Sequence, residues 1–287
     1  MLPANFDANI EQAARVIRDA EALLVTAGAG MGVDSGLPDF RGTEGFWRAY
    51  PAIAKLGLRF EEMANPSWFE RSPELAWAFY GHRLALYRKT KPHAGFQRLL
   101  DCGKQKRHGY FVFTSNVDGQ FQKAGFAPER IAEVHGSLHH FQCCQPCHEH
   151  IWDAVQESIL IDESKFLALA PLPKCPHCRG IARPNVLMFG DYSWIGNRSE
   201  AQDIRLRDWL LSLTSGKRTI KRKLAIIEMG AGTTISSVRN LSERVADECD
   251  ATLIRINPRE PDVPEGQIKL SFGAKEGLRR IFELIET

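Results

Sequence analysis

Four apolar runs of five or six residues constrain the fold of this chain more than any other feature. Glycine or turn residues bound each run, and helical patterns occur at residues 10–20, 72–87, 235–248 and 275–285. Short runs rich in β-branched residues are typical of strands buried on both faces of a parallel sheet. The pattern predicts an α/β fold with strands at residues 22–26, 110–114, 224–228 and 251–256.

Two segments depart from this alternation. Residues 43–92 are rich in Trp and Phe and predict inserted helices, and residues 137–185 carry most of the cysteines and histidines. We expect a parallel sheet domain made of residues 1–42, 93–136 and 186–287. The segments 43–92 and 137–185 would then form a smaller helical, cysteine-rich module.

The composition is that of an ordinary globular protein, with 44% hydrophobic and 25% charged residues. A net charge of +2 and a pI near 8.2 predict no broad field for nucleic acid or a membrane surface. The basic run at residues 217–223 is interpreted as a solvated segment. The sequence shows neither a signal peptide nor the roughly 20 apolar residues that cross a bilayer, so we expect a cytoplasmic chain with reduced cysteines.

The first predicted strand runs into a glycine-rich loop, GAGMGVDSGLPDFRG, at residues 28–42. Glycines directly after a strand let the backbone turn tightly and approach a pyrophosphate, which favours dinucleotide binding by a Rossmann-like sheet. A tight structural turn explains the glycines alone equally well. The tail SGLPDFRG differs from the ordinary Rossmann fingerprint, which continues into a helix.

The complete loop resembles the signature of the sirtuins, GAG followed after a short spacer by SGIPDFRG. Further motifs follow in the family's order: TSNVDG at 114–119 for TQNIDG, VHGS at 134–137, two cysteine pairs, RPNVLMFGD at 183–191 for RPxVVxFGE, and IN at 256–257. Chance agreement of so many ordered motifs is negligible. The chain is similar to sirtuins of the bacterial type, which are NAD-dependent protein deacylases.

This resemblance implies that NAD is the co-substrate. Asn116 and Asp118 would face the nicotinamide ribose and the nicotinamide, and Asn257 would lie near the adenosine end. The implied NAD-binding residues are Gly28, Ala29, Gly30, Asp39, Phe40, Arg41, Ser115, Asn116, Val117, Asp118, Gly230, Ala231, Gly232, Asn257 and Ala274.

Two residues depart from the family pattern close to the ribose. Gly32 replaces the serine that follows GAG and one spacer residue, and Ser115 replaces the glutamine of TQNID. Fewer hydrogen bonds are therefore expected around the bond that is broken. The sequence MGAGTT at 229–234 replaces the family's GTS, where small residues still allow close backbone approach.

His135 begins the HGS motif and is the implied catalytic base. In sirtuins the acyl oxygen of a modified lysine attacks the ribose of NAD as nicotinamide leaves, and the matching histidine then takes a proton from a ribose hydroxyl. An unperturbed histidine, with a pKa of about 6.5, is largely neutral at pH 7 and can accept that proton. His139 and His140 are expected at the surface or behind the base.

Cysteines 143, 144 and 147 are followed after a long loop by cysteines 175 and 178. Two close cysteine pairs around a loop are typical of a tetrahedral structural zinc site. Cys144 with Cys147 has the commoner spacing, whereas Cys143 lies at the family's distance from HGS. We predict one structural zinc per chain in the small module, with the ligands Cys143, Cys147, Cys175 and Cys178 and with Cys144 as the alternate.

Two features concern the substrate. Residues 187–190 match the sirtuin segment that pairs with an extended acyl-lysine peptide, so the implied contacts are Leu187, Phe189 and Gly190. Tyr80 and Arg83 are three residues apart, on one face of a predicted helix. In sirtuins that remove succinyl and malonyl groups, such a pair holds the acyl carboxylate. An amphipathic helix with the arginine in water explains the pair equally well.

The resemblance implies removal of acyl groups from lysine side chains of proteins, with release of nicotinamide and O-acyl-ADP-ribose. An NAD hydrolase or ADP-ribosyltransferase would use the same pocket, and Gly32 and Ser115 keep that alternative open. A non-catalytic module that binds NAD or ADP-ribose is disfavoured by the intact His135, Asn116 and Asp118. The expected partner is an acyl-lysine peptide or protein, with no nucleic acid and no membrane.

Overall fold

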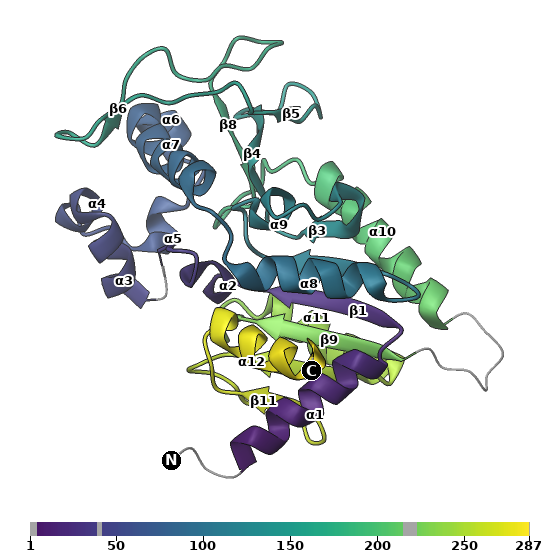
Figure 1. Ribbon diagram of the computed structural model, residues 1–287. Helices are drawn as coiled ribbons and strands as arrows, with labels where there is room; N and C mark the ends of the chain where they lie inside the picture. The colour runs from purple at the N-terminus through teal and green to yellow at the C-terminus, as the bar shows by residue number, and fades with distance from the viewer. Residues whose placement is uncertain (1–4, 39–41, 215–222, 287) are drawn as a thin grey trace.

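The computed structural model describes residues 5–38, 42–214 and 223–286. Its centre is a six-stranded parallel sheet with helices on both faces (Figure 1). All residues of the three central strands are buried, which explains their continuous apolar runs. The strands are β1 (Ala22–Ala27), β2 (Tyr110–Thr114), β3 (Ile131–Glu133), β9 (Leu224–Met229), β10 (Thr252–Ile256) and β11 (Ile268–Leu270).

The strand order is β11-β10-β9-β1-β2-β3. Numbered by their order along the chain, these six strands have the 3-2-1-4-5-6 arrangement of the Rossmann fold. The order reverses between β1 and β9, which pair from Ala22 with Leu224 to Ala27 with Met229. Open sheets of this kind bind ligands outside the carboxyl ends of the strands at the reversal. The predicted Rossmann-like α/β sheet is therefore confirmed.

Helices bury apolar residues on both faces of the sheet. One core lies between the sheet and α1 (Asn5–Asp19), α8 (Ala94–Gln105) and α12 (Ala274–Glu286). The other lies under α10 (Asn197–Thr214) and α11 (Ser237–Cys249). Hydrogen bonds attach α10 to β3, since the Glu133 N–H donates to Gln202 Oε1 at 3.0 Å and Ser199 Oγ donates to the Glu133 carbonyl at 2.9 Å. α10 thus covers the β3 edge of the sheet.

The remaining elements leave the sheet after β1 and after β3. The first excursion is helical and comprises α2 (Gly30–Val33), α3 (Gly42–Ala49), α4 (Pro51–Lys55), α5 (Phe60–Met63), α6 (Trp68–Arg71) and α7 (Pro73–Lys89). Short elements precede the second excursion, namely α9 (Gln120–Lys123) and a 3-10 turn (Pro128–Arg130). That excursion contains β4 (Gly136–Cys143), β5 (Trp152–Asp153), β6 (Ile161–Asp162), β7 (Leu167–Ala168) and β8 (Ala182–Val186).

A separate apolar core joins the two excursions. It includes Phe46, Trp77 and Phe141, and the indole nitrogen of Trp77 donates to the Ala182 carbonyl at 3.0 Å. β4 is the central strand of the order β5-β4-β8 and runs antiparallel to both neighbours. This core supports the predicted small module, whose boundaries remain a prediction.

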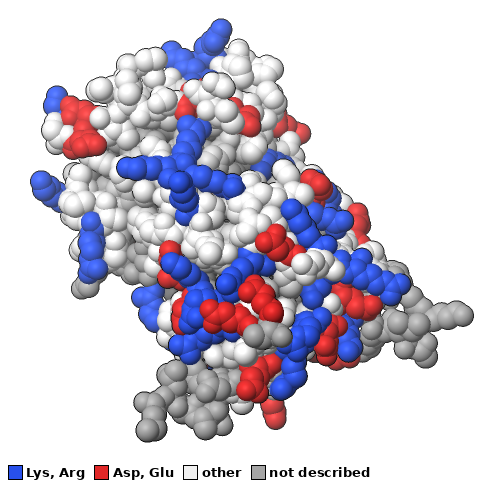
Figure 2. All heavy atoms as spheres, viewed as in Figure 1, with Lys and Arg blue, Asp and Glu red and all other residues white. Residues whose placement is uncertain are grey.

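None of the helices in the described ranges combines the length and apolar character that a membrane crossing requires. On the face shown in Figure 2, basic and acidic side chains are interspersed over the sheet domain. That face therefore carries no stripe of a single sign over the sheet, which agrees with the small net charge of +2.

Candidate active site

The glycine loops that follow β1 and β9 contact each other at the reversal of strand order. Gly28 N donates to the Met229 carbonyl at 2.9 Å, and Gly30 N donates to the Gly230 carbonyl at 3.0 Å. Gly230 has a φ of +60°, and a Cβ there would lie 2.4 Å from the backbone of Gly30. Only glycine fits this contact. The loops consequently present backbone rather than bulky side chains at the carboxyl edge, as an approaching pyrophosphate requires.

Two of the predicted NAD contacts hold these loops in place. Asn116 Nδ2 donates to the Gly28 carbonyl at 3.0 Å, and Asn257 Nδ2 donates to the Ala231 carbonyl at 2.8 Å. Asn257 Oδ1 also accepts from the N–H of Glu260 at 3.0 Å. Both carboxamides are thus engaged with the backbone, so they shape the loops that would receive NAD.

His135 lies in the turn between β3 and β4 and is half-buried. Burial lowers the pKa of His135 below its usual value, and a hydrogen bond to the backbone of Ser115 partly offsets this effect. The imidazole is therefore neutral at pH 7 and can accept a proton. The next residue is Gly136, whose φ is +79° and where a Cβ would lie 2.1 Å from the Asn185 carbonyl oxygen. The glycine of HGS is a steric requirement of this turn.

Asp118 is a buried carboxyl group in the loop after β2. Burial raises its pKa to about 6, although the Gln120 N–H donates to Asp118 Oδ1 at 2.9 Å and favours the charged form. His139 Nε2 lies 3.0 Å from the Asp118 carbonyl, so this histidine packs behind the loop. His139 and His140 are both half-buried, which favours the expected positions behind the base over positions at the surface.

The other predicted NAD residues differ in how far they are exposed to solvent. Asp39, Phe40 and Arg41 lie outside the described residues. Gly30 and Gly232 are half-buried and Ala29 is exposed on the glycine loops, whereas the buried members are Gly28, Val117, Gly230, Ala231 and Ala274.

The departure at Gly32 has a local cause. A Cβ at Gly32 would lie 2.8 Å from Leu37 Cδ1, so the leucine occupies the space in which the family's serine would stand. The hydroxyl is therefore replaced by apolar packing, and a serine here would require Leu37 to move.

The predicted substrate segment leaves β8 beside the histidine. Leu187 N donates to the His135 carbonyl at 3.0 Å. The N–H of Phe189 donates to the Ala64 carbonyl at 2.9 Å, and its carbonyl accepts from Asn65 Nδ2 at 3.1 Å. The N–H and the carbonyl of Phe189 are thus already hydrogen-bonded within the chain. Fewer backbone groups of residues 187–190 are therefore left to pair with a peptide than predicted. The side chains of Leu187 and Phe189 remain 38% and 39% exposed, and Gly190 is exposed beside them.

A buried ion pair holds the ends of this segment together. The guanidinium of Arg183 binds both carboxylate oxygens of Asp191 and also donates to the Val186 carbonyl at 2.9 Å. Asp191 Oδ2 accepts from the Met188 N–H at 3.2 Å. In the sequence these residues are the first and last letters of RPNVLMFGD, a pattern from which their positioning role was not predicted. The signal available in the sequence for this ion pair was an arginine and an acid at the two ends of an apolar segment.

Tyr80 and Arg83 lie inside the small module, which contradicts the alternative of an arginine in water. Arg83 is 6% exposed, and its Nε and Nη2 donate to Tyr87 Oη at 3.1 and 2.8 Å. Tyr80 Oη is buried and has no hydrogen-bond partner among the described residues. Tyr87 was missed by sequence reasoning, although it is four residues beyond Arg83 on the same helical face. The guanidinium carbon lies 5.2 to 5.8 Å from the ring centroids of Phe60, Phe79, Tyr80 and Tyr87.

Four thiols lie together at the C-terminal end of β4. Cys143 Sγ is 3.6 Å from Cys178 Sγ, and Cys147 Sγ is 3.7 Å from Cys175 Sγ. Zinc bonds of about 2.3 Å in a tetrahedron place sulfurs about 3.8 Å apart, so this cluster fits a structural zinc. Cys144 instead packs against the core of the small module. The structure thus favours Cys143 over Cys144.

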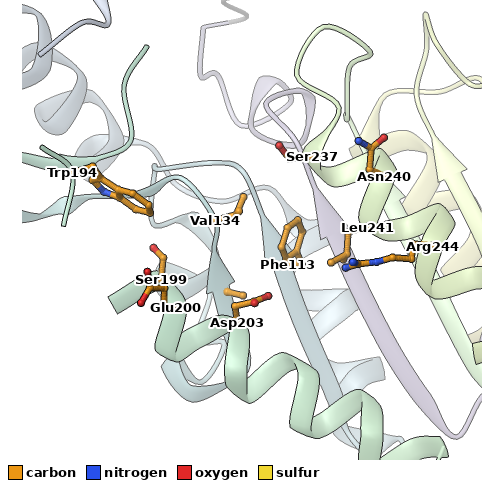
Figure 3. Close-up of a pocket in the computed structure, with 11 residues that line it drawn as sticks. Phe113, Val134, Trp194, Ser199, Glu200, Asp203, Ser237, Asn240, Leu241 and Arg244 are labelled. Atoms are coloured by element: carbon orange, nitrogen blue, oxygen red, sulfur yellow. The ribbon is translucent and has the colours of Figure 1, made fainter. Parts of the chain in front are cut away.

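A pocket of about 440 Å³ opens between α10 and α11 (Figure 3). Its apolar lining includes Phe113, Val134 and Leu241, and the predicted NAD residues take no part in it. Its charged groups are Glu200, Asp203 and Arg244. These charges of both signs favour no single class of ligand.

The sequence profile of the Sir2 family matches residues 28–217. The chain belongs to the Sir2 family. A curated NAD-dependent protein deacylase of Thermococcus sibiricus is 34% identical over 185 residues, which span 63% of this chain and 65% of that relative. A protein of the same name from Thermus thermophilus is 28% identical over 273 residues, covering 94% of this chain and 92% of the relative. A solved complex of a Sir2 homologue with NAD shares the fold, with a TM-score of 0.71, 24% identity and coverage of 96% and 94%.

Membership in the Sir2 family confirms the predicted enzyme class, an NAD-dependent protein deacylase, and NAD as the co-substrate. The glycine loops at the reversal of strand order are compatible with NAD, and the four thiols are compatible with zinc. The roles of individual residues in this Sir2-family chain remain predictions.

Proposed function

We propose that this Sir2-family protein transfers acyl groups from lysine side chains of proteins to the ribose of NAD, and that it prefers acyl groups ending in a carboxylate. One observation carries the transfer: a neutral, half-buried His135 lies between the loop after β2 and the segment after β8. Its ring contacts the Ser115 backbone, and its carbonyl accepts from Leu187 N. The base thus contacts both the predicted NAD side and the predicted peptide side.

On the NAD side, the glycine loops would approach the pyrophosphate while Asn116 and Asn257 keep those loops in position. NAD supplies the ribose that accepts the acyl group, and nicotinamide is the leaving group. Asp118 would lie at the nicotinamide end, where a carboxyl with a pKa of about 6 is mostly ionised at pH 7 and accepts hydrogen bonds. His135 would take the proton of the ribose hydroxyl that attacks the acyl carbon.

On the peptide side, the exposed Leu187 and Phe189 offer apolar surface to an extended substrate. A path of side chains leads inward from this surface. Phe189 meets Phe60 edge to face at a centroid distance of 6.2 Å, and the Arg83 guanidinium lies 5.8 Å from the Phe60 ring. The positive charge of Arg83 also favours ionised Asp118. We therefore place Arg83 between the peptide surface and the nicotinamide end.

The preference for an acidic acyl group follows from the surroundings of Arg83. A buried guanidinium among aromatic rings interacts more strongly with a carboxylate than an exposed one does. The unpartnered hydroxyl of Tyr80 can donate to the same carboxylate. An acetyl group offers neither contact.

An NAD hydrolase or ADP-ribosyltransferase remains the second candidate. Near the ribose, Gly32 removes the family's hydroxyl and Ser115 replaces its carboxamide with a shorter hydroxyl, which weakens control over the attacking nucleophile. We rank it lower because Leu187 connects the predicted peptide segment directly to His135.

Nicotinamide release from NAD tests both functions. The purified protein is assayed with acetyl-lysine peptide, with succinyl-lysine peptide and without peptide. If the protein is a deacylase, nicotinamide release should depend on the acyl-lysine peptide. Nicotinamide release at a similar rate without peptide would identify a hydrolase. Charge-assisted hydrogen bonds contribute about 1.5 to 3 kcal/mol, so succinyl peptide should be preferred by about tenfold or more.

Two variants isolate the source of this preference. Arg83→Met should abolish it and spare deacetylation, and Tyr80→Phe should reduce it without removing packing. Arg71→Met, at an exposed position on α6, is the matched control and should keep it. Equal efficiencies on both peptides in the unmodified protein would refute the acyl preference and leave the deacylase function standing.

We also propose a cytoplasmic location. The seven cysteines are free thiols, and four of them form the metal-binding cluster. Such thiols need a reducing compartment.

A further inference from the structure

Three histidines form a second cluster of potential ligands beside the four thiols. One ring nitrogen from each of His148, His150 and His177 lies within 4.8 Å of the others. The ring centroids of His148 and His177 are 3.9 Å apart, and His150 lies 5.7 Å from His148 and 5.8 Å from His177. None of these residues belongs to the four-thiol cluster. The zinc predicted there therefore leaves the histidines without an assigned role.

The two nitrogens of His148 have different surroundings. Its Nε2 lies 3.3 Å from Cys175 Sγ, and its Nδ1 accepts from the His150 N–H at 2.9 Å. Nε2 is thus the nitrogen on the side of the thiols. Nδ1 lies at the opposite edge of the ring, where an ion can replace the His150 N–H. A histidine that binds a metal through one nitrogen and donates the other N–H to an anion is a common arrangement in metalloproteins.

The exposure of the cluster suits an exchangeable ion. His150 and His177 are exposed and His148 is half-buried, so an ion can enter from solvent and keep water in its coordination sphere. Imidazole nitrogens are preferred ligands of zinc and of later divalent transition metals. Three of them leave a fourth position open, unlike four thiolates, which complete a tetrahedron.

We propose that His148, His150 and His177 form a second metal site, which binds a divalent transition metal such as Zn²⁺ reversibly. The ion takes Nδ1 of His148 in place of the His150 N–H and one nitrogen from each of the exposed rings. The contact between His148 and Cys175 makes the two sites neighbours. The first zinc is retained during purification, whereas the second is lost on dialysis and returns with added metal.

Equilibrium dialysis of the purified full chain against buffered Zn²⁺, followed by elemental analysis, tests this site. The unmodified protein should rise from one bound zinc per chain to two. The double variant His150→Gln/His177→Gln should stay at one, and these exposed positions make the exchange safe for folding. His108→Gln, which removes a histidine that precedes β2, is the matched control and should still reach two.

Three outcomes would overturn the proposal. The unmodified protein could stop at one zinc when free zinc is in large excess. The double variant could still bind a second zinc, which would place that ion elsewhere. The double variant could instead lose the first zinc, which would make the histidines part of the thiol site. Titration with Co²⁺ gives a separate readout, because the second ion should add no thiolate charge-transfer absorption.

Discussion

The side-chain amide of Asn116 donates to the carbonyl oxygen of Gly28 at 3.0 Å, and this bond joins the loop after β2 to the glycine loop after β1. A side chain thus joins the loops after two neighbouring strands at the edge where NAD is proposed to bind. The bond holds the backbone of Gly28 in position, which glycine cannot do through a side chain of its own.

Asn116→Ala should therefore weaken NAD binding while the fold persists. Loss of one hydrogen bond that leaves its acceptor unpaired costs about 1 to 2 kcal/mol, which corresponds to about a tenfold rise in the KM for NAD. Steady-state kinetics with varied NAD measures this change. Asn197→Ala, at the start of α10, is the control. An unchanged KM would show that the loop keeps its shape without the bond.

Asp118→Asn should stabilise the protein and impair turnover. Burial raises the pKa of Asp118 from 3.8 to about 6, so its ionisation in the folded state is unfavourable. The stability that the protonated carboxyl provides at low pH is lost as pH rises from about 4 to 6. The Asp118→Asn protein avoids this loss. Its free energy of unfolding should exceed that of the unmodified protein by about 1 to 3 kcal/mol above pH 6, and by little at pH 4.

Urea unfolding at pH 4 and pH 7.5 measures the gain at Asp118. Asp208→Asn, at an exposed position on α10, should show no gain at either pH. A loss of stability at pH 7.5 in Asp118→Asn would contradict the assigned cost of ionisation.

His135→Ala should retain NAD binding and lose acyl transfer, because the ring acts on a proton and holds little of the ligand. The pKa of His135 is lowered by burial, so the neutral base is present throughout the neutral range. Turnover should be flat around pH 7 and fall only on the acid side, below pH 6.5. NAD titration and the pH profile of kcat are the measurements. Lost NAD binding in the alanine variant would instead assign a structural role.

Cys175→Ala should release the structural zinc and unfold the small module, because three thiolates leave the site incomplete. Cys144→Ala provides the contrast, since its thiol lies outside the cluster and its loss removes only packing. Elemental analysis and thermal melts distinguish the two. A Cys175→Ala protein with its zinc and melting temperature intact would disprove the ligand assignment.

The sequence predicted those features that depend on local pattern. The central strands are buried on both faces, so their apolar runs located β1, β2 and β9 within one residue. The order of the strands was not visible in these runs, because parallel pairing joins segments far apart in the chain. Cys143 could be preferred to Cys144 only through its distance from HGS, since spacing alone favoured the other.

Predictions that depended on packing were less complete. The sequence could not decide between a buried and a solvated Arg83, because Phe60 of α5 packs against it in addition to the rings of α7. The N–H of Phe189 donates to Ala64 and its carbonyl accepts from Asn65, and both partners lie more than a hundred positions earlier in the chain. No periodicity within residues 187–190 could have revealed that contact.

The antiparallel pair β4 and β8 connects the two ends of the small module. It pairs Gly136 with Val186 beside the histidine and Cys143 with Ala182 beside the thiols, and its register shifts between Ser137 and Phe141. Side chains alternate with a period of two, so a slip of one residue would reverse the side chains of the pairs at that end. The five residues of β8 place these two ends about 13 Å apart, so a metal that fixes Cys143 opposite Ala182 also restrains the start of the segment proposed to receive the peptide. Zinc, although remote from the acyl group, would thus help to hold that segment in position beside the base.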